Sequence, residues 1–193
     1  AYPAPPTEAP EEQKEPEAYP EEEEASGAAA TWRADGAVTD GEYAHSTDIG
    51  DMTLWWSNDA DSLYVALRGS TEGWISVGLD PDNRMKGANY LICAVDADGA
   101  TIWDAYGQGT VGATHPPDED LGGSNDVLAY GASEADGVTI MEAQIPLDSG
   151  DQYDKALSPG ESYPVIVAMG SGDGFNAGHS FRSGGEIVLD AAP

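Results

Sequence analysis

Residues 90–107, YLICAVDADGATIWDAYG, place two apolar runs on either side of a short turn. The first run, YLICAVD (90–96), is apolar at nearly every position, which is typical of a strand in the middle of a sheet. The second run, TIWDAYG (101–107), is the natural partner strand. Between them, DADGA (96–100) supplies the Asp and Gly residues that a tight hairpin turn requires. This stretch therefore predicts an antiparallel hairpin.

The same rhythm of short apolar runs and Asp, Asn or Gly turns extends outward over the rest of the chain after residue 30. It predicts further strands in MTLWWS (52–57), LYVALRG (63–69), WISVGLD (74–80), VLAYGAS (127–133), VTIMEAQIPL (138–147), YPVIVAMG (163–170) and EIVLD (186–190). Only LDSGDQYDKALSPGE (147–161) predicts a helical turn. We therefore expect one all-β domain over residues 31–193, an antiparallel, immunoglobulin-like β-sandwich of about nine to eleven strands.

Residues 1–30 differ from the rest in composition. They hold nine glutamates, one lysine and six prolines, and their only large apolar side chains are Tyr2 and Tyr19. Such a segment buries too little surface to offset the entropy of ordering. We predict a disordered or extended acidic tail that acts as a tether. A tail of this kind could also join copies of the chain into a homo-oligomer or filament by adding to a neighbour's sheet edge.

The charge of the chain restricts its partners. The formal net charge is −29, of which the tail carries −8 and residues 31–193 carry −21. A surface this acidic repels phosphate backbones and anionic lipids, so nucleic-acid or membrane-surface binding is not expected. We expect its partners to be cations, a neutral small molecule or a protein with a basic surface. With three lysines and four arginines, the chain also suits a salt-rich habitat.

Two features bear on the compartment. The chain begins at Ala1 and continues with an acidic, Pro-rich lead, which we interpret as a secreted protein after removal of its signal peptide. The sequence contains no stretch of about eighteen apolar residues, so we predict no membrane span. The single cysteine, Cys93, cannot form an intrachain disulfide, and its apolar setting predicts an inert, buried thiol.

The common catalytic motifs are missing from the sequence. It contains no G-x-S-x-G, no H-E-x-x-H, no phosphate-binding loop and no dinucleotide fingerprint. One cysteine excludes a thiolate zinc site and a covalent C-x-x-C-H haem site. Among 36 acidic residues, nothing selects a catalytic pair. We therefore do not expect an enzyme.

Met85 stands out within DPDNRMKGANY (80–90), a stretch otherwise made of turn residues. Methionine usually fills gaps in cores, but its thioether sulfur is also a metal ligand. Two interpretations are therefore open, a plug at the end of the core or a ligand. The closely spaced oxygens of DPDNRMKG (80–87) and VDADG (95–99) also make calcium a candidate ligand, against the alternative of solvated turns.

His179 lies between a Gly-rich stretch and the last predicted strand, with Phe175 and Phe181 on either side. Loops at the end of a sandwich are where binding residues gather. A thioether and an imidazole together form an axial pair that suits a six-coordinate haem iron. His45 and His115 are interpreted as surface loop residues, with His115 as a reserve ligand.

Several stretches together resemble the DOMON family, over about residues 31–190. They are DGAVTDGEY (35–43), LWWSNDADSLYVAL (54–67), GWISVGLDPDNRMKGANYLICAVDADG (73–99), WDAYG (103–107), DLGGSNDV (120–127), IPLDSGDQYDKAL (145–157) and GHSFRSGG (178–185). Within the family, the chain is most similar to bacterial secreted members related to the cytochrome domain of cellobiose dehydrogenase and the haem subunit of ethylbenzene dehydrogenase.

This resemblance implies a non-covalent b-type haem held by a β-sandwich. Met85 and His179 fall on the positions of the two axial ligands, and Trp74, Tyr90 and Phe175 are candidates for the pocket wall. For Trp74 and Tyr90, plain core packing is the alternative. The implied function is electron transfer with a redox partner that has a basic surface. The alternatives are a haem-free carbohydrate-binding or calcium-stabilised module, and a structural subunit of an extracellular assembly.

Overall fold

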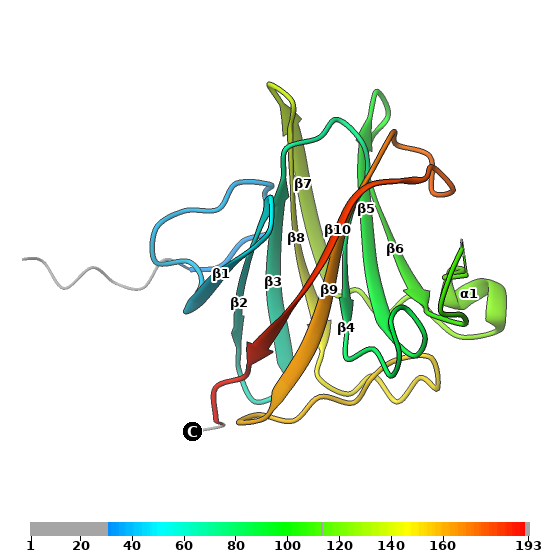
Figure 1. Cartoon of the computed structure of the whole chain (residues 1–193). Coiled ribbons are helices and arrows are strands. Elements are labelled where there is room, and N and C mark those ends of the chain that lie inside the picture. Colours follow the sequence, from blue (N-terminus) through cyan, green and yellow to red (C-terminus); the bar gives the residue numbers. More distant parts are fainter. Residues whose placement is uncertain (1–30, 113, 192–193) are drawn as a thin grey trace, which may run out of the picture.

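The computed structural model describes residues 31–112 and 114–191, and the interpretation of residues 1–30 as a tether lies outside this part of the chain. Figure 1 shows two stacked sheets and one short helix. The elements in chain order are β1 (His45–Ile49), β2 (Met52–Asn58), β3 (Ser62–Gly69), β4 (Ile75–Leu79), β5 (Asn89–Asp96), β6 (Gly99–Tyr106), α1 (Asp118–Leu121), β7 (Ala129–Ala135), β8 (Val138–Pro146), β9 (Ser162–Gly170) and β10 (His179–Val188).

Both sheets have five strands, and all of their pairs are antiparallel. One sheet has the order β1-β2-β3-β8-β7 and the other has the order β10-β9-β4-β5-β6. The predicted hairpin within residues 90–107 is β5 and β6, which pair from Asn89 opposite Tyr106 to Asp96 opposite Gly99. The all-β sandwich expected from the sequence is thus confirmed.

The main core lies between the two sheets. Inward residues alternate along each strand, and both sheets contribute to one cluster whose members include Leu54, Leu67, Val77, Leu91, Met141 and Val167. Cys93 is buried in this cluster, and burial raises the pKa of its thiol to about 12. It is therefore a small apolar core residue, as predicted.

The structure differs from the sequence-based predictions in three places. The strand predicted at 186–190 is longer, because β10 begins at His179 and pairs with β9 along its whole length. A strand at His45–Ile49, β1, was not predicted. The helical turn predicted at 147–161 is wrong, because these residues form turns and coil, and the helix α1 lies at Asp118–Leu121 instead.

Residues 31–44, the blue segment before β1 in Figure 1, are fixed to the outer face of the first sheet by Glu142 of β8. Its carboxylate accepts hydrogen bonds from the backbone N–H groups of Asp35 (3.0 Å), Gly36 (2.7 Å) and Ala37 (3.2 Å) and from the Tyr43 hydroxyl (2.9 Å). Glu142 is fully buried, and burial raises the pKa of its carboxyl group. This single side chain therefore organises the start of the domain.

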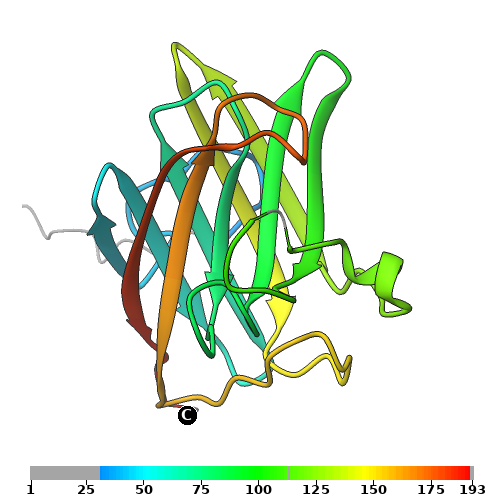
Figure 2. The ribbon, with the colours of Figure 1, turned by 45° about the vertical axis from the view of Figure 1, so that its right-hand side comes forward.

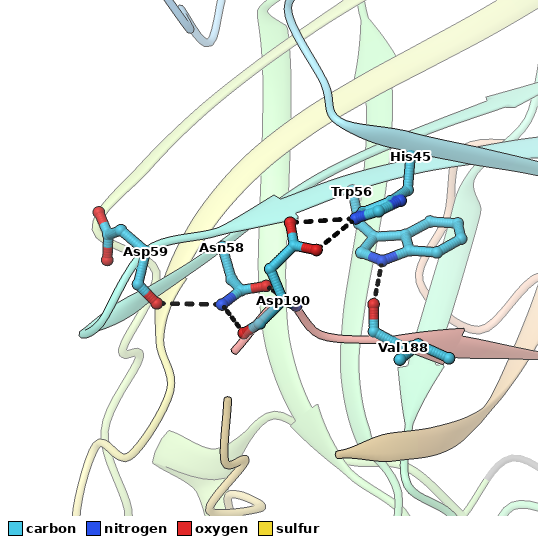
Figure 3. Close-up of polar contacts among 6 residues, drawn as sticks. All are labelled: His45, Trp56, Asn58, Asp59, Val188 and Asp190. Carbon is cyan, nitrogen blue, oxygen red and sulfur yellow. Dashed lines mark hydrogen bonds and ion pairs between the residues drawn. The ribbon is translucent and has the colours of Figure 1, made fainter. Parts of the chain in front are cut away.

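A cluster of polar contacts joins the end of β10 to the first two strands, as Figure 3 shows. The Trp56 indole N–H donates to the Val188 carbonyl oxygen at 2.8 Å. The His45 ring stacks on Trp56, and its Nε2 lies 3.0 Å from the Asp190 carboxylate. Asn58 exchanges two hydrogen bonds with the Asp190 backbone. These contacts join the edge strands of the two sheets, and they place His45 in a strand and not in a loop.

Among the described residues, no helix has the length and apolar character that crossing a membrane requires.

Candidate functional site

A second apolar cluster lies on the outer face of the sheet β10-β9-β4-β5-β6, opposite the main core. Its buried members are Trp74, Ala88, Tyr90, Ile92, Ala94, Ala105 and Ala168, with Met85 and Phe175 packed against them. This explains why 90–96 is apolar at nearly every position: Leu91 and Cys93 face the main core, whereas Tyr90 and Ile92 face outward. An outer sheet face this apolar needs a cover.

Three loops provide that cover and border a cavity of about 680 Å³ that is partly open to solvent. They are the β4–β5 loop with Met85, the segment between β6 and α1 with His115, and the β9–β10 loop with Phe175. Figure 2 shows the segment between β6 and α1 crossing in front of the sheet. Cofactor and small-molecule sites occupy about 300–1,000 Å³ and are mostly apolar with a few polar groups. The cavity has both properties.

Trp74, one of the predicted wall residues, is positioned by close packing. A Cβ at Gly170 would overlap the Trp74 indole, so the ring needs glycine at that place in β9. The indole N–H donates to the Ala177 carbonyl oxygen at 3.1 Å, which holds the β9–β10 loop over the sheet. Trp74 is 1% exposed. The structure therefore places it both in an apolar cluster and in the cavity wall.

Met85 is half-buried and lines the cavity from the β4–β5 loop. The loop is held to the end of β6 by hydrogen bonds from the Gly87 N–H to the Gly107 carbonyl (2.7 Å) and from the Gly107 N–H to the Ala88 carbonyl (2.9 Å). The Met85 carbonyl leaves no room for a Cβ at Gly107. Met85 is thus outside the main sandwich core, and its side chain belongs to the cavity wall.

His179, the first residue of β10, lines the same cavity. Its ring meets the Trp74 ring edge to face, with 5.5 Å between the centroids. Desolvation lowers the pKa of His179, and the nearby His115 lowers it further. A neutral imidazole is the form that binds a metal. The structure thus brings Met85, His179, Trp74, Tyr90 and Phe175 to one cavity.

His115 is the residue that sequence reasoning placed wrongly. It is 7% exposed and lies in the cavity wall between Tyr90 and Phe175, at centroid distances of 5.4 and 5.7 Å. It is therefore not a surface residue, although it was named as a reserve ligand. Burial lowers its pKa. Its aromatic partners come from β5 and the β9–β10 loop. Because these segments are distant in sequence, ATHPPDED (113–120) alone does not predict that His115 is buried.

Polar atoms of the cavity wall point to a polar ligand. The Tyr90 hydroxyl and His115 Nδ1 are buried and have no hydrogen-bond partner within the described part of the chain. Buried polar atoms are normally paired. Arg84 and Arg182 also line the cavity, which takes two of the four arginines of a strongly acidic chain. A ligand with an apolar body and one or more anionic groups would match this wall.

The loops named as calcium candidates do not form an acidic group of their own in residues 31–112 and 114–191. Asp80 and Asp82 lie 3.7 and 2.8 Å from the Lys155 ammonium group, which compensates their charge. The Asp82–Lys155 contact lowers the pKa of Asp82. In the β5–β6 turn, Asp96 accepts a hydrogen bond from the Asp98 N–H at 2.8 Å, which is ordinary turn chemistry.

Comparison with known proteins gives both a family and a fold. The model of the DOMON domain matches residues 48–170, more than half of the chain. The cytochrome b domain of pyranose dehydrogenase from Coprinopsis cinerea aligns with a TM-score of 0.51 at 13% identity, over 72% of this chain and 76% of that one. The cytochrome domain of Myriococcum thermophilum cellobiose dehydrogenase aligns with a TM-score of 0.52 at 9% identity, over 77% and 84%.

A third structure is a family 9 carbohydrate-binding module from Caldicellulosiruptor kristjanssonii in complex with glucose. It aligns at 14% identity over 84% of this chain and 93% of that one, with a TM-score of 0.42, too low to infer a shared fold.

Proposed function

This chain belongs to the DOMON family, and from that membership we propose that it binds a b-type haem non-covalently in the outer-face cavity and carries single electrons. The observation that supports the proposal most is the composition of the cavity wall. A methionine, two histidines and two arginines surround an apolar floor. The aligned structures are named as cytochrome domains of dehydrogenases, which agrees with this class of cofactor.

The residues of the wall suit the parts of a haem. The ring is flat and apolar, which suits the surface formed by Trp74, Ile92 and Phe175. Its two carboxylates suit the guanidinium groups of Arg84 and Arg182. The cavity volume of about 680 Å³ lies within the range of cofactor sites. The Tyr90 hydroxyl and His115 Nδ1, which have no hydrogen-bond partner among the described residues, are further polar groups that a bound ligand could satisfy.

We propose Met85 and His179 as the axial ligands. A b-type haem with a thioether and an imidazole in its axial positions supplies reversible one-electron transfer. In this role the chain itself would bind and orient the cofactor, and the three cover loops would keep water from its faces. Because Met85 and His179 would both be ligands of the iron, no coordination position would remain for a substrate, so an electron carrier fits this proposal and an enzyme does not.

The charge of the chain supports a redox partner with a basic surface. A net charge of −29 steers oppositely charged proteins toward the domain and raises their association rate at low salt. We propose a secreted location, with the acidic residues 1–30 as a tether.

Hemin uptake tests the cofactor directly. We expect the purified protein, as isolated or after hemin is added, to show the sharp Soret, α and β bands of six-coordinate low-spin haem, at one haem per chain. Absorbance titration measures this. The control is His45→Ala, which removes a histidine outside the cavity and should titrate identically. A colourless protein that takes up no hemin would contradict the proposal and favour a haem-free binding module.

Met85→Leu separates the two roles considered for this residue. If Met85 only fills space, leucine conserves its volume, costs less than about 1.5 kcal/mol of unfolding free energy and leaves the spectrum unchanged. We expect instead that ferric haem becomes high-spin, or is lost, because leucine has no atom that can coordinate iron. The matched control is Met141→Leu, the same change in the main core. Low-spin haem in Met85→Leu would show that the sulfur is not a ligand.

A further inference from the structure

A group of aspartates lies at the β6 and α1 end of the domain, outside the haem cavity proposed above. Asp104 comes from β6, Asp126 from the segment between α1 and β7, and Asp154 from the segment between β8 and β9. One carboxylate oxygen from each lies within 4.8 Å of the other two. Asp118, the first residue of α1, is next to the group, and Figure 1 shows α1 beside the end of β6.

The burial of this group sets it apart from the many solvated acids of the chain. Asp104 is 3% exposed and Asp118 is 0% exposed. Asp104 Oδ1, both carboxylate oxygens of Asp118 and Asp154 Oδ1 are buried without a hydrogen-bond partner within the described residues. Among the described residues, Asp104 Oδ2 accepts from the Asp126 N–H at 2.8 Å, Asp126 Oδ2 accepts from the Ser124 hydroxyl at 3.0 Å, and Asp154 Oδ2 accepts from the Ser149 hydroxyl at 2.5 Å.

The group also has no positive side chain to balance it. In residues 31–112 and 114–191, no lysine, arginine or histidine forms an ion pair with any of these four aspartates. Buried carboxylates are costly unless they are paired or bind a metal. A cation held by these carboxylates would remove that cost.

We propose that Asp104, Asp126 and Asp154 bind a calcium ion, with the buried carboxylate of Asp118 beside them adding negative charge to the site. All of the available atoms are oxygens, which are the ligands that hard cations prefer. Calcium binds 6–8 oxygens at about 2.3–2.6 Å, so oxygens on opposite sides of the ion are about 5 Å apart. The spacing within 4.8 Å suits that shell. Magnesium requires a smaller octahedron, which carboxylates from three separate segments and a helix are poorly suited to form.

The position of the group gives the ion a defined role. It would connect β6, α1 and the segments before β7 and before β9, which pack together with little regular structure. Asp118 lies three residues after His115, and the Tyr106 N–H bonds to the Pro116 carbonyl at 3.1 Å. The ion would therefore fix the segment that carries His115 into the cavity wall. The proposal rests on the carboxylates alone and does not depend on haem binding.

Calorimetry and thermal unfolding of the full chain test this site. After removal of metals with a chelator, calcium chloride is titrated in about 1 M KCl, where the Debye length is about 3 Å and general charge screening is saturated. We expect one calcium per chain. At a calcium concentration about a hundredfold above Kd, we expect Tm to rise by about 5–10 °C.

Asp104→Asn and Asp118→Asn keep the side-chain shape and remove one charge each. We expect each to weaken calcium binding by at least about tenfold and to remove most of the calcium-dependent rise in Tm. In the presence of chelator, the Tm of each variant should not fall below that of the unchanged protein, because each variant has less charge repulsion among these aspartates. The control is Asp136→Asn, which removes an equal charge at the exposed β7–β8 turn.

Three results would overturn the proposal. They are no heat and no Tm shift with calcium, an equal effect of magnesium at the same concentration, or an equal loss of the calcium response in Asp136→Asn. The hemin titration is scored separately, so a protein that binds calcium and no haem would support this inference and contradict the proposed function.

Discussion

Changing His179 to alanine is expected to remove low-spin haem from the protein and to leave the sandwich folded. His179 lies at the start of β10, exposed and outside the main core, so its loss costs little packing. Losing a residue that only hydrogen-bonds to a metal ligand typically lowers affinity by about 10–100-fold. If the His179 imidazole is itself an axial ligand, haem affinity should fall by more than that. Absorbance titration with hemin measures the affinity, and circular dichroism checks the fold.

The other two histidines provide the controls for this variant. His115→Ala should weaken haem binding moderately, because His115 packs in the cavity wall, and should keep the low-spin spectrum. His45→Ala should change neither the affinity nor the spectrum, since His45 lies outside the cavity, beside Asp190 just past the far end of β10. If His179→Ala retained low-spin haem while His115→Ala lost it, His115 would be the ligand and the proposed assignment of His179 would be wrong.

Changing Glu142 to alanine is expected to cause a large loss of stability. The buried carboxylate accepts four hydrogen bonds, three from backbone N–H groups and one from Tyr43. Its removal leaves these donors unpaired and opens a cavity, at a cost of at least about 3 kcal/mol. For a domain of this size, Tm should fall by about 10 °C. Differential scanning calorimetry measures the change.

Glu186→Ala is the matched control, because it removes the same charge from an exposed position in β10. Its Tm should change by only a degree or two, in line with ordinary surface substitutions. Glu142→Gln keeps the shape and one acceptor oxygen but replaces the other oxygen by an NH2 donor, so its Tm should lie between the two. Equal melting temperatures for Glu142→Ala and Glu186→Ala would show that residues 31–44 do not depend on this carboxylate.

The sequence predicted the sandwich well where side-chain patterns are local. The run at 90–107 predicted the β5–β6 hairpin, because continuous apolar runs and turn residues act over a few neighbours. Prediction from the sequence failed where tertiary contacts decide which segments pair as strands. HSFRSGG (179–185) has little β propensity, yet it forms most of β10 because β9 offers it a complete hydrogen-bonding edge. HSTDI (45–49) forms β1 for the same reason.

The candidate site was predicted in part. The family resemblance selected Met85, His179 and three aromatic residues, and the structure brings all five to one cavity. It did not predict Arg84, Arg182 or the burial of His115, since these converge only when the three cover loops fold over the sheet. The sequence also did not predict the group of four aspartates, because they come from separate segments of a chain with 36 acidic residues.

The two faces of the sheet β10-β9-β4-β5-β6 have a consequence for how this protein can evolve. Side chains that point inward from β4 and β5 complete the core that holds the sandwich together, whereas their sequence neighbours point outward into the cavity. Substitutions on the outward face that keep an apolar side chain of similar size can alter ligand preference while the main core stays unchanged. Divergence of function and preservation of fold therefore draw on different residues of the same strands.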